Sequence, residues 1–331
     1  MKLGIGFGGP TNTTMVEALD YVVEAERLGA DYAWSAEAWS GDAVTPLAYL
    51  AAKTQRIKLG TGIMQISARV PSMIAMTASC LAAMSDNRFI LGLGVSGPQV
   101  VEGLQGVPFA RPLSRMRETV AIVRKALAGE KLVFEGREFV LPRPGGEGKA
   151  LRLDLPPNPD IPIYLATLGP RSLEVTGEIA NGWLGTSFTP NAAEAHLGHL
   201  RKGAENAGRT LGDIDLQTQT TAVVGDDVER IVAGLKPAFA FQLGAMGSKD
   251  TNFYNDAFCR AGFEDDAKAV QALWVEGKRD QATARVPDDM VLKFGLIGTP
   301  AMIKERVSIY EAAGISTLNL RFPAKDARER I

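Results

Sequence analysis

The side chains that follow the apolar runs of this sequence are mostly small, aromatic or sulfur-containing. They are Phe7, Gly8, Gly9, Glu37, Trp39, Met64, Gln65, Ser96, Gly97, Thr167, Gly169, Thr186, Ser187, Phe188, Asn319 and Arg321. They provide no carboxylate pair for glycoside hydrolysis, no metal-binding cluster, no Schiff-base lysine and no Ser-His-Asp set. Such a surface suits a flat, largely uncharged ring that brings its own reactivity. We predict a flavin-type cofactor; the alternative is that these residues only cover the end of the core.

One segment, Gly169-Pro170-Arg171-Ser172, has the features of a phosphate-binding helix start. It follows a buried apolar run and opens a helix, whose first backbone N–H groups are free to bind an anion. Gly169 lets the backbone approach the anion closely, and Arg171 adds a fixed positive charge. The alternative is an ordinary capped helix with an exposed arginine.

A second glycine pattern, GxGxxG, is formed by Gly92, Gly94 and Gly97. In a dinucleotide-binding fold this turn leads directly into a helix, and an acidic residue ends the second strand about 20 residues later. Here Pro98 and further glycines and prolines interrupt the stretch after Gly97, and no such acidic residue follows. The context therefore argues against a Rossmann site.

The chain has two histidines, His196 and His199, which lie three residues apart on one predicted helix face. Neither has a carboxylate or thiol partner at the spacing of metal ligands. We therefore predict a solvated helix face and no metal site.

Composition excludes several classes of protein. The 36 basic and 38 acidic residues nearly cancel, giving a formal charge of −2, and no basic cluster suggests nucleic-acid binding. Cys80 and Cys259 are far apart, which is typical of a reducing cytoplasm rather than a disulfide framework. The N-terminus lacks the features of a signal peptide, and no apolar run reaches the length of a membrane span.

The order of the predicted elements is a repeated strand then helix. Strands buried on both faces, which are typical of parallel sheets, are predicted at 3–7, 32–35, 57–64, 89–93, 161–166, 182–185, 216–224 and 317–322. Helices are predicted at 15–28, 73–84, 115–128, 173–180, 192–207 and 302–313. About eight such units predict a single (β/α)₈ TIM barrel over residues 1–331, with insertions near 97–112, 131–160 and 239–291. A doubly wound sheet is the second choice.

Local capping signals support these boundaries. Thr14 and Glu17 form a capping-box pattern, and Gly29 and Gly314 are placed to end helices. Four helix starts are predicted where a capping residue precedes a proline, at Thr45-Pro46, Gly169-Pro170, Thr189-Pro190 and Thr299-Pro300.

Four long segments, which are spread along the chain, carry a resemblance to a known family: residues 34–69, 87–109, 161–183 and 298–320. Together they resemble the bacterial luciferase-like superfamily, specifically its F420-dependent branch related to methylenetetrahydromethanopterin reductase. The resemblance implies a TIM barrel, a deazaflavin cofactor and a homodimer. It also implies two-electron chemistry, because a deazaflavin has carbon in place of the nitrogen through which flavins react with oxygen.

The resemblance implies particular cofactor contacts. In the family, a bulge in the third strand contains a non-prolyl cis peptide that backs the deazaflavin ring, and the matching positions are Gly62 and Ile63, with Met64 beside them. Further contacts are expected at Val95, Ser96, Gly97, Gly185 and Thr186, and the phosphate region at Thr167, Gly169, Pro170 and Arg171.

Family members place an ionisable residue after the second strand, often His or Asp, where this sequence has Glu37. Shielded by Trp34, Trp39 and the ring, Glu37 would act as an acid or base; exposed, it would only bind substrate. The leading hypothesis is F420-dependent hydride transfer to or from a small organic substrate. The alternatives are an FMN-dependent monooxygenase on the same fold and a barrel that binds a cofactor without turnover.

Overall fold

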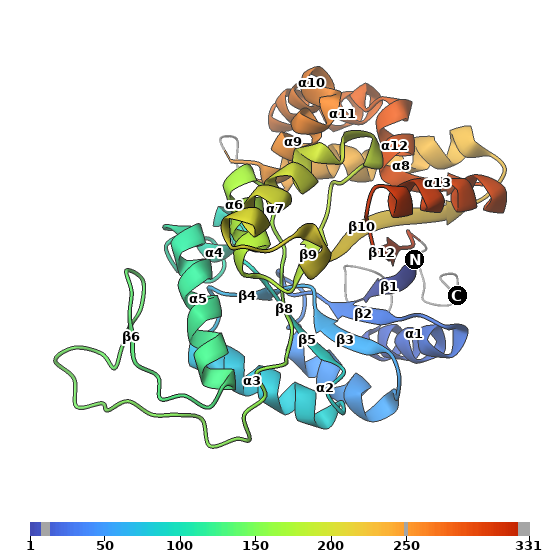
Figure 1. Ribbon diagram of the computed structural model, residues 1–331. Helices are drawn as coiled ribbons and strands as arrows, with labels where there is room; N and C mark the ends of the chain where they lie inside the picture. The colour runs from blue at the N-terminus through green and yellow to red at the C-terminus, as the bar shows by residue number, and fades with distance from the viewer. Residues whose placement is uncertain (8–13, 248–250, 324–331) are drawn as a thin grey trace.

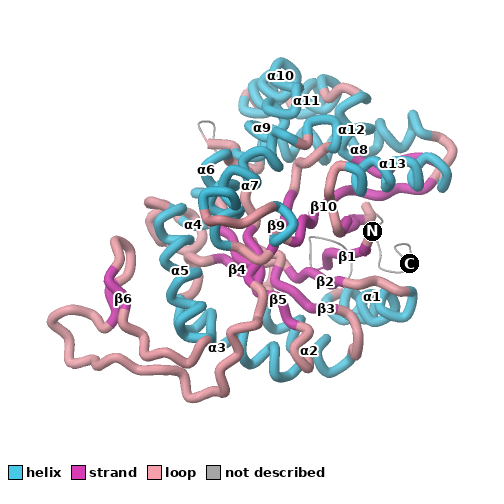
Figure 2. Tube along the Cα trace, viewed as in Figure 1, coloured by secondary structure: helices cyan, strands magenta, loops and turns pink. Residues whose placement is uncertain are grey.

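Eight parallel strands form a closed barrel surrounded by helices in the computed structural model, which describes residues 1–7, 14–247 and 251–323 (Figures 1 and 2). The barrel strands are β1 (Lys2–Phe7), β2 (Tyr32–Ser35), β3 (Lys58–Thr61), β5 (Phe89–Gly94), β8 (Ile163–Leu165), β9 (Gly182–Gly185), β10 (Asp215–Val224) and β12 (Thr317–Arg321). Strand β12 closes the ring because it pairs in parallel with both β1 and β10. The predicted TIM barrel is confirmed. Gly8 and Gly9, which were expected at the end of the first strand, lie outside the described residues.

Two short strands extend this ring. After residues 62 and 63 the third strand resumes as β4 (Met64–Gln65), which pairs with the upper end of β5. Strand β11 (Gly295–Gly298) pairs with the last residues of β10, outside the closed ring. Strand β11 was not predicted from the sequence. The signal that could have indicated it is a four-residue run that begins and ends with glycine.

The helices surround the barrel strands. They are α1 (Met15–Leu28), α2 (Val44–Lys53), α3 (Pro71–Met84), α5 (Pro112–Leu127), α6 (Pro170–Ile179), α7 (Glu194–Asn206), α8 (Val228–Ala245) and α13 (Pro300–Ala312). The Thr14–Glu17 capping box is present at α1, and Gly29 ends that helix with φ 107°. Gly169 and Thr299 also cap the helices predicted for them.

Two predicted helix starts were wrong. Helix α2 begins before Thr45, because the Asp42 carboxylate accepts hydrogen bonds from Val44 N and Thr45 N, both at 2.8 Å. The Thr189-Pro190 pair opens only a 3₁₀ turn, η1 (Pro190–Ala192), and α7 follows it. A short helix, α4 (Pro98–Val101), also begins directly after Gly97, where the sequence suggested an interruption.

The segments expected as insertions have structure of their own. Residues 131–160 contain an antiparallel hairpin of β6 (Phe134–Glu135) and β7 (Val140–Leu141), which projects from the barrel (Figure 1). Between β10 and β11 lie α8, α9 (Phe253–Phe258), the π-helical η3 (Cys259–Phe263), α10 (Glu264–Val275), α11 (Arg279–Arg285) and α12 (Asp288–Phe294). These helices share a separate apolar core that includes Phe239, Phe258 and Phe294.

Side-chain alternation along the strands produces an outer and an inner layer. The outer layer packs against the helices and includes Leu59, Leu91 and Leu165. The inner layer is mainly aromatic, with Tyr32, Trp34, Ile90, Tyr164 and Leu184 in one buried cluster. Glycines make room for it, since a Cβ at Gly60 would lie 2.3 Å from the Trp34 ring.

The GxGxxG glycines also serve packing. A Cβ at Gly92 would lie 1.8 Å from the Thr61 carbonyl oxygen, and a Cβ at Gly94 would lie 2.9 Å from the Ile63 side chain. These two positions therefore require glycine because neighbouring strands approach closely. Within the described ranges, no helix has the length and apolar character needed to cross a membrane.

Candidate functional site

The third strand carries a bulge at the C-terminal end of the barrel, the end at which TIM-barrel enzymes bind their ligands. The Gly62–Ile63 peptide bond is cis, as the resemblance predicted. Gly62 N donates to the Ser35 carbonyl at 2.7 Å, and Glu37 N donates to the Ile63 carbonyl at 3.2 Å. The loop after β2 therefore holds the bulge on both sides of this bond.

Two serines that follow barrel strands have left-handed backbone conformations. Ser96 follows β5 with φ 60°, and Ser187 follows β9 with φ 51°. Such conformations are uncommon for residues other than glycine, and they concentrate at functional sites. The Ser187 hydroxyl also accepts a hydrogen bond from Gln242 Nε2 of α8 at 2.9 Å. Sequence reasoning placed both serines at strand ends but gave no signal of their backbone conformation.

Three of the predicted cofactor contacts do not present side chains to the barrel interior. Met64 is fully buried in the outer layer, and Val95 packs against that same layer. A Cβ at Gly185 would lie 2.4 Å from the ring of Trp183, which belongs to an outer cluster. Because alternate residues of a strand face opposite sides, the neighbours Ile63, Ser96 and Thr186 occupy the inner positions.

Glu37 lies in the loop that holds the bulge, and its carboxylate accepts three hydrogen bonds. Oε1 accepts from Gln65 N at 2.8 Å and from Arg69 Nη1 at 2.5 Å. Oε2 accepts from Ala43 N at 3.1 Å. The Glu37 side chain is only 9% exposed, whereas Trp39, which was expected to shield it, is itself 59% exposed. Arg69, which sequence reasoning missed, is the charged partner.

Gln65 extends this network across the mouth of the barrel. Its Nε2 donates to the Glu37 carbonyl at 2.9 Å, and Gln105 Nε2 donates to its Oε1. Gln105 belongs to the segment 97–112, so one chain of contacts connects the loops after β2, β4 and β5. Gln65 is the middle member of this chain, and Glu37 connects it to the loop after β2.

The start of α6 follows β8, which is separated from the bulged strand only by β5. Gly169 occupies the N-cap position without any side-chain cap, and the Ser172 hydroxyl donates to the Gly169 carbonyl at 2.7 Å. Arg171 is exposed in the first turn, which contains no acidic residue. Thr167 contacts Thr176 through their hydroxyl groups at 2.7 Å. The N-terminus of α6 thus has the geometry of an anion-binding helix start.

The sequence comparisons agree with this geometry. A family model described as luciferase-like monooxygenase matches residues 4–317. The chain belongs to the luciferase-like monooxygenase family. The resemblance seen in the sequence is therefore confirmed.

Relatives of this luciferase-like chain extend over nearly its full length. A Mycobacterium tuberculosis protein named as a coenzyme F420-dependent oxidoreductase is 38% identical over 96% of this chain and 94% of its own. The 5,10-methylenetetrahydromethanopterin reductase of Methanolobus tindarius is 28% identical over 100% of this chain and 97% of its own. The solved F420-dependent tetrahydromethanopterin reductase of Methanopyrus kandleri shares the fold, with a TM-score of 0.79, 24% identity and coverage of 98% and 95%.

The prediction of a solvated face for both histidines of this luciferase-like protein was wrong. His196 is 1% exposed and packs among Trp183, Phe188 and Tyr310 of the outer layer, whereas His199 is partly exposed and contacts Glu174. Neither ring nitrogen of His196 has a hydrogen-bond partner among the described residues. Burial lowers the pKa of His196 to about 4, with a further contribution from Arg260. No group of three or more metal-ligating side chains occurs among the described residues.

We expect His196 to make the folded state sensitive to acid. Its pKa is about 4 when folded and about 6.5 when unfolded, so the unfolded chain binds the extra proton. The contribution of neutral His196 to the free energy of unfolding is therefore complete above pH 6.5. This contribution is lost as the pH falls toward 4, by about 2 kcal/mol at pH 5. Urea unfolding measures the decrease in the free energy of unfolding between pH 7 and pH 5. This decrease should be about 2 kcal/mol smaller in His196→Phe and His196→Leu than in the wild type. Equal losses in all three proteins would refute this assignment.

Proposed function

We propose that this chain is an F420-dependent oxidoreductase that transfers a hydride between the deazaflavin and a small organic substrate. The observation that carries the proposal is the bulge at residues 62 and 63, which lies at the C-terminal end of the barrel beside β5, whose end leads into the Ser96 loop; α6 follows the next strand of the ring, β8. The relatives named for coenzyme F420 support the same cofactor. When bound, the deazaflavin supplies the carbon that accepts or gives up the hydride.

The residues of the mouth fit a flat ring with an anionic side chain. Among the described residues, a Cβ at Gly6 would meet no atom within 4 Å, and Gly94 leaves room for the Ile63 side chain. Gly62, Ile63, Ser96, Gly97 and Thr186 would surround the ring. Thr167, Gly169, Pro170 and Arg171 would hold the phosphate region through backbone amides and charge. The substrate would lie against the exposed face of the ring, where the surrounding loops exclude water.

The cofactor assignment is testable by binding. F420 should bind the purified protein, with FMN at least about tenfold weaker, as followed by fluorescence titration. Gly94→Ala should weaken F420 binding by about tenfold, because the new Cβ would lie 2.9 Å from Ile63 and push that side chain toward the ring. Gly148→Ala is the control, since its Cβ would meet no described atom within 4 Å. Tight FMN binding with none for F420 would instead favour the monooxygenase alternative.

We further propose that Glu37 takes up or supplies the proton that accompanies hydride transfer. Its backbone N–H binds the Ile63 carbonyl, which places the residue beside the bulge. All three contacts of its carboxylate are with hydrogen-bond donors: Arg69, Gln65 N and Ala43 N. To deliver a proton, the carboxylate would have to exchange one of these donors for the substrate, and the Arg69 side chain is the partner that can rotate away.

Glu37→Gln should separate proton transfer from loop support. If Glu37 carries the proton, single-turnover reduction of a substrate panel by reduced F420 should slow by about 10²-fold or more, and one limb of the pH-rate profile should vanish. Arg69→Met is the matched variant, because it removes the same ion pair and leaves the carboxylate in place. Unchanged rates in Glu37→Gln with F420 still bound, or identical defects in both variants, would show that Glu37 only holds the loops.

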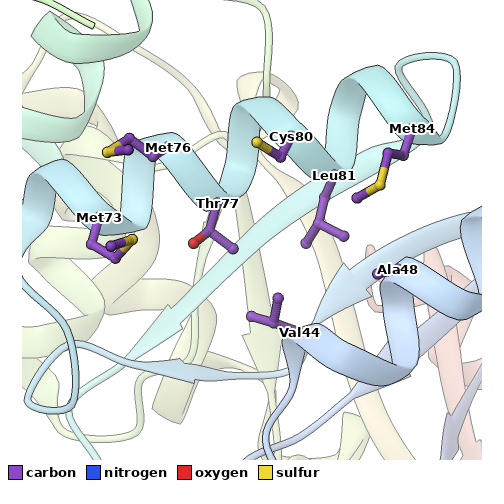
Figure 3. A pocket seen from close by; sticks show the side chains of 8 residues that line it. All are labelled: Val44, Ala48, Met73, Met76, Thr77, Cys80, Leu81 and Met84. Carbon is purple, nitrogen blue, oxygen red and sulfur yellow. The ribbon is translucent and has the colours of Figure 1, made fainter.

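We also propose that the chain forms a homodimer through an apolar groove between α2 and α3. The groove is lined by Val44, Ala48, Met73, Met76, Thr77, Cys80, Leu81 and Met84 (Figure 3). Helix α3 contains no charged residue, yet Met73, Met76 and Met84 are each more than 40% exposed. A two-fold axis brings identical faces together, so an uncharged face can pair with itself without like-charge repulsion. Flexible methionines suit such a self-complementary contact.

Met76→Lys should convert the dimer into a monomer, because two lysines would be buried opposite each other across the axis. Sedimentation velocity at micromolar concentration measures the change. Val133→Lys, which replaces a 59% exposed residue near the β6–β7 hairpin, is the control and should remain dimeric. A monomeric wild type, or a dimeric Met76→Lys variant, would refute this interface.

A further inference from the structure

A cavity on the outer wall of the barrel lies between α5 and the C-terminal end of α6. It has a volume of about 460 Å³ and is lined by Arg117, Val120, Ala121, Arg124, Glu178, Ile179, Asn181 and Arg209. Asn181 immediately precedes β9, so the cavity lies near the N-terminal end of that strand. The candidate cofactor site, which includes the start of α6, lies at the C-terminal ends of the strands. The two sites are therefore at opposite ends of α6.

Three guanidinium groups line this cavity, but among the described residues only one carboxylate does. That carboxylate belongs to Glu178, and Arg117 already binds both of its oxygens, with Nη1 donating to Oε1 at 2.7 Å. The hydrogen bonds from Arg117 lower the pKa of Glu178. The Asp213 carboxylate lies near Arg209 without lining the cavity, and it accepts two hydrogen bonds from the residue three positions before it. The cavity therefore carries an excess of positive charge.

Arg124 and Arg209 bind neighbouring carbonyl groups at the end of α6. Arg124 Nη2 donates to the Ile179 carbonyl at 2.7 Å, and Arg209 Nη2 donates to the Ala180 carbonyl at 2.7 Å. Partial burial lowers the pKa of Arg124, and the charge of Arg209 lowers it further. The C-terminal end of a helix carries about −0.5 of an elementary charge, which offsets only part of two positive charges. The two guanidinium groups therefore repel each other at the edge of the cavity.

Arg124 retains hydrogen-bond donors that a ligand could use. Its hydrogen bonds to protein groups, one to the Ile179 carbonyl and one to Asn181 Oδ1, both come from Nη2. In the described part of the chain, Nε and Nη1 have no such partner, and neither is sealed off from solvent. The rest of the lining is apolar and includes Val120 and Ala121. Guanidinium donors beside an apolar surface suit an organic ligand that has an acidic group on an apolar body.

We infer that this cavity binds a small organic anion, whose carboxylate or phosphate group lies against Arg124 and Arg209 and whose apolar part lies against Val120 and Ala121. The inference goes beyond the proposed function, because the cavity shares no residue with the candidate cofactor site. A guanidinium binds the paired oxygens of either acidic group through charge-assisted hydrogen bonds. The bound anion also relieves the repulsion between the two neighbouring positive charges.

Isothermal titration calorimetry with benzoate and with phenyl phosphate tests the inference, and the tighter of the two identifies the acidic group. Arg124→Gln should weaken binding of that anion by about tenfold, because its charge-assisted hydrogen bonds are lost. Benzyl alcohol, which has no charge, should bind the wild type at least about tenfold more weakly. Arg171→Gln changes the start of the same helix and should leave binding unchanged, which separates this cavity from the candidate cofactor site. Arg201→Gln is the charge-matched control, since Arg201 pairs with Glu194 on α7.

Ala121→Glu tests the charge of the cavity without removing an arginine. The new carboxylate would lie three residues before Arg124 on α5, within reach of its guanidinium. It should abolish binding of both anions and raise the melting temperature, whereas Ala121→Gln, of equal size and no charge, should not raise it. Equal affinities in the wild type, Arg124→Gln and Ala121→Glu would overturn the inference. So would equal affinity for benzyl alcohol, or no binding of either anion at millimolar concentration.

Discussion

Alternation of side chains along the eight parallel strands is the constraint on which the rest of the structure depends. It sends residues such as Leu59 and Leu91 outward to the helices and turns Tyr32, Trp34 and Tyr164 inward. The aromatic rings fill the lower levels of the barrel, where Tyr164 also donates to Asp215 at 2.5 Å. Above them the inner positions hold smaller residues, including Gly94, Ser96 and Thr186. A barrel that is filled below and sparsely filled above can accept a ring only at its C-terminal end.

The same alternation explains which parts of the site could be predicted from the sequence. Apolar runs and capping patterns located the barrel strands and six of the helices, because those signals are local. The inward or outward direction of Met64 and Val95 depends on register beside the bulge at residues 62 and 63, because one extra residue reverses the face. The direction of Gly185 depends on the register at the end of β9. The cis Gly62–Ile63 bond was anticipated only through family resemblance.

Other features could not be predicted because they depend on tertiary contacts. His196 lies on a helix of mixed composition, and its burial follows from the packing of α7 against Trp183 and Phe188. Helix α2 begins at Val44 rather than at the expected Thr45 cap, and the backbone at its start is held by tertiary and loop contacts: Asp42 accepts from Val44 N, and Glu37 accepts from Ala43 N. Arg69 and Arg260 gave no sequence signal, since an arginine in a polar stretch is ordinarily exposed.

Segments outside the regular strand-helix units hold the loops of the mouth in place. Gln105 from the segment 97–112 binds Gln65, Gln242 from α8 binds the Ser187 hydroxyl, and Arg260 from η3 binds the Leu168 carbonyl. Each contact reaches a different strand end, and one of them supports a left-handed residue whose conformation costs about 1 kcal/mol or more. The barrel strands therefore determine where a ring can bind, whereas these segments determine the shape and charge of the space around it. Changes in the helices between β10 and β11 can alter the bound ligand without disturbing the barrel, because these helices pack around a separate apolar cluster.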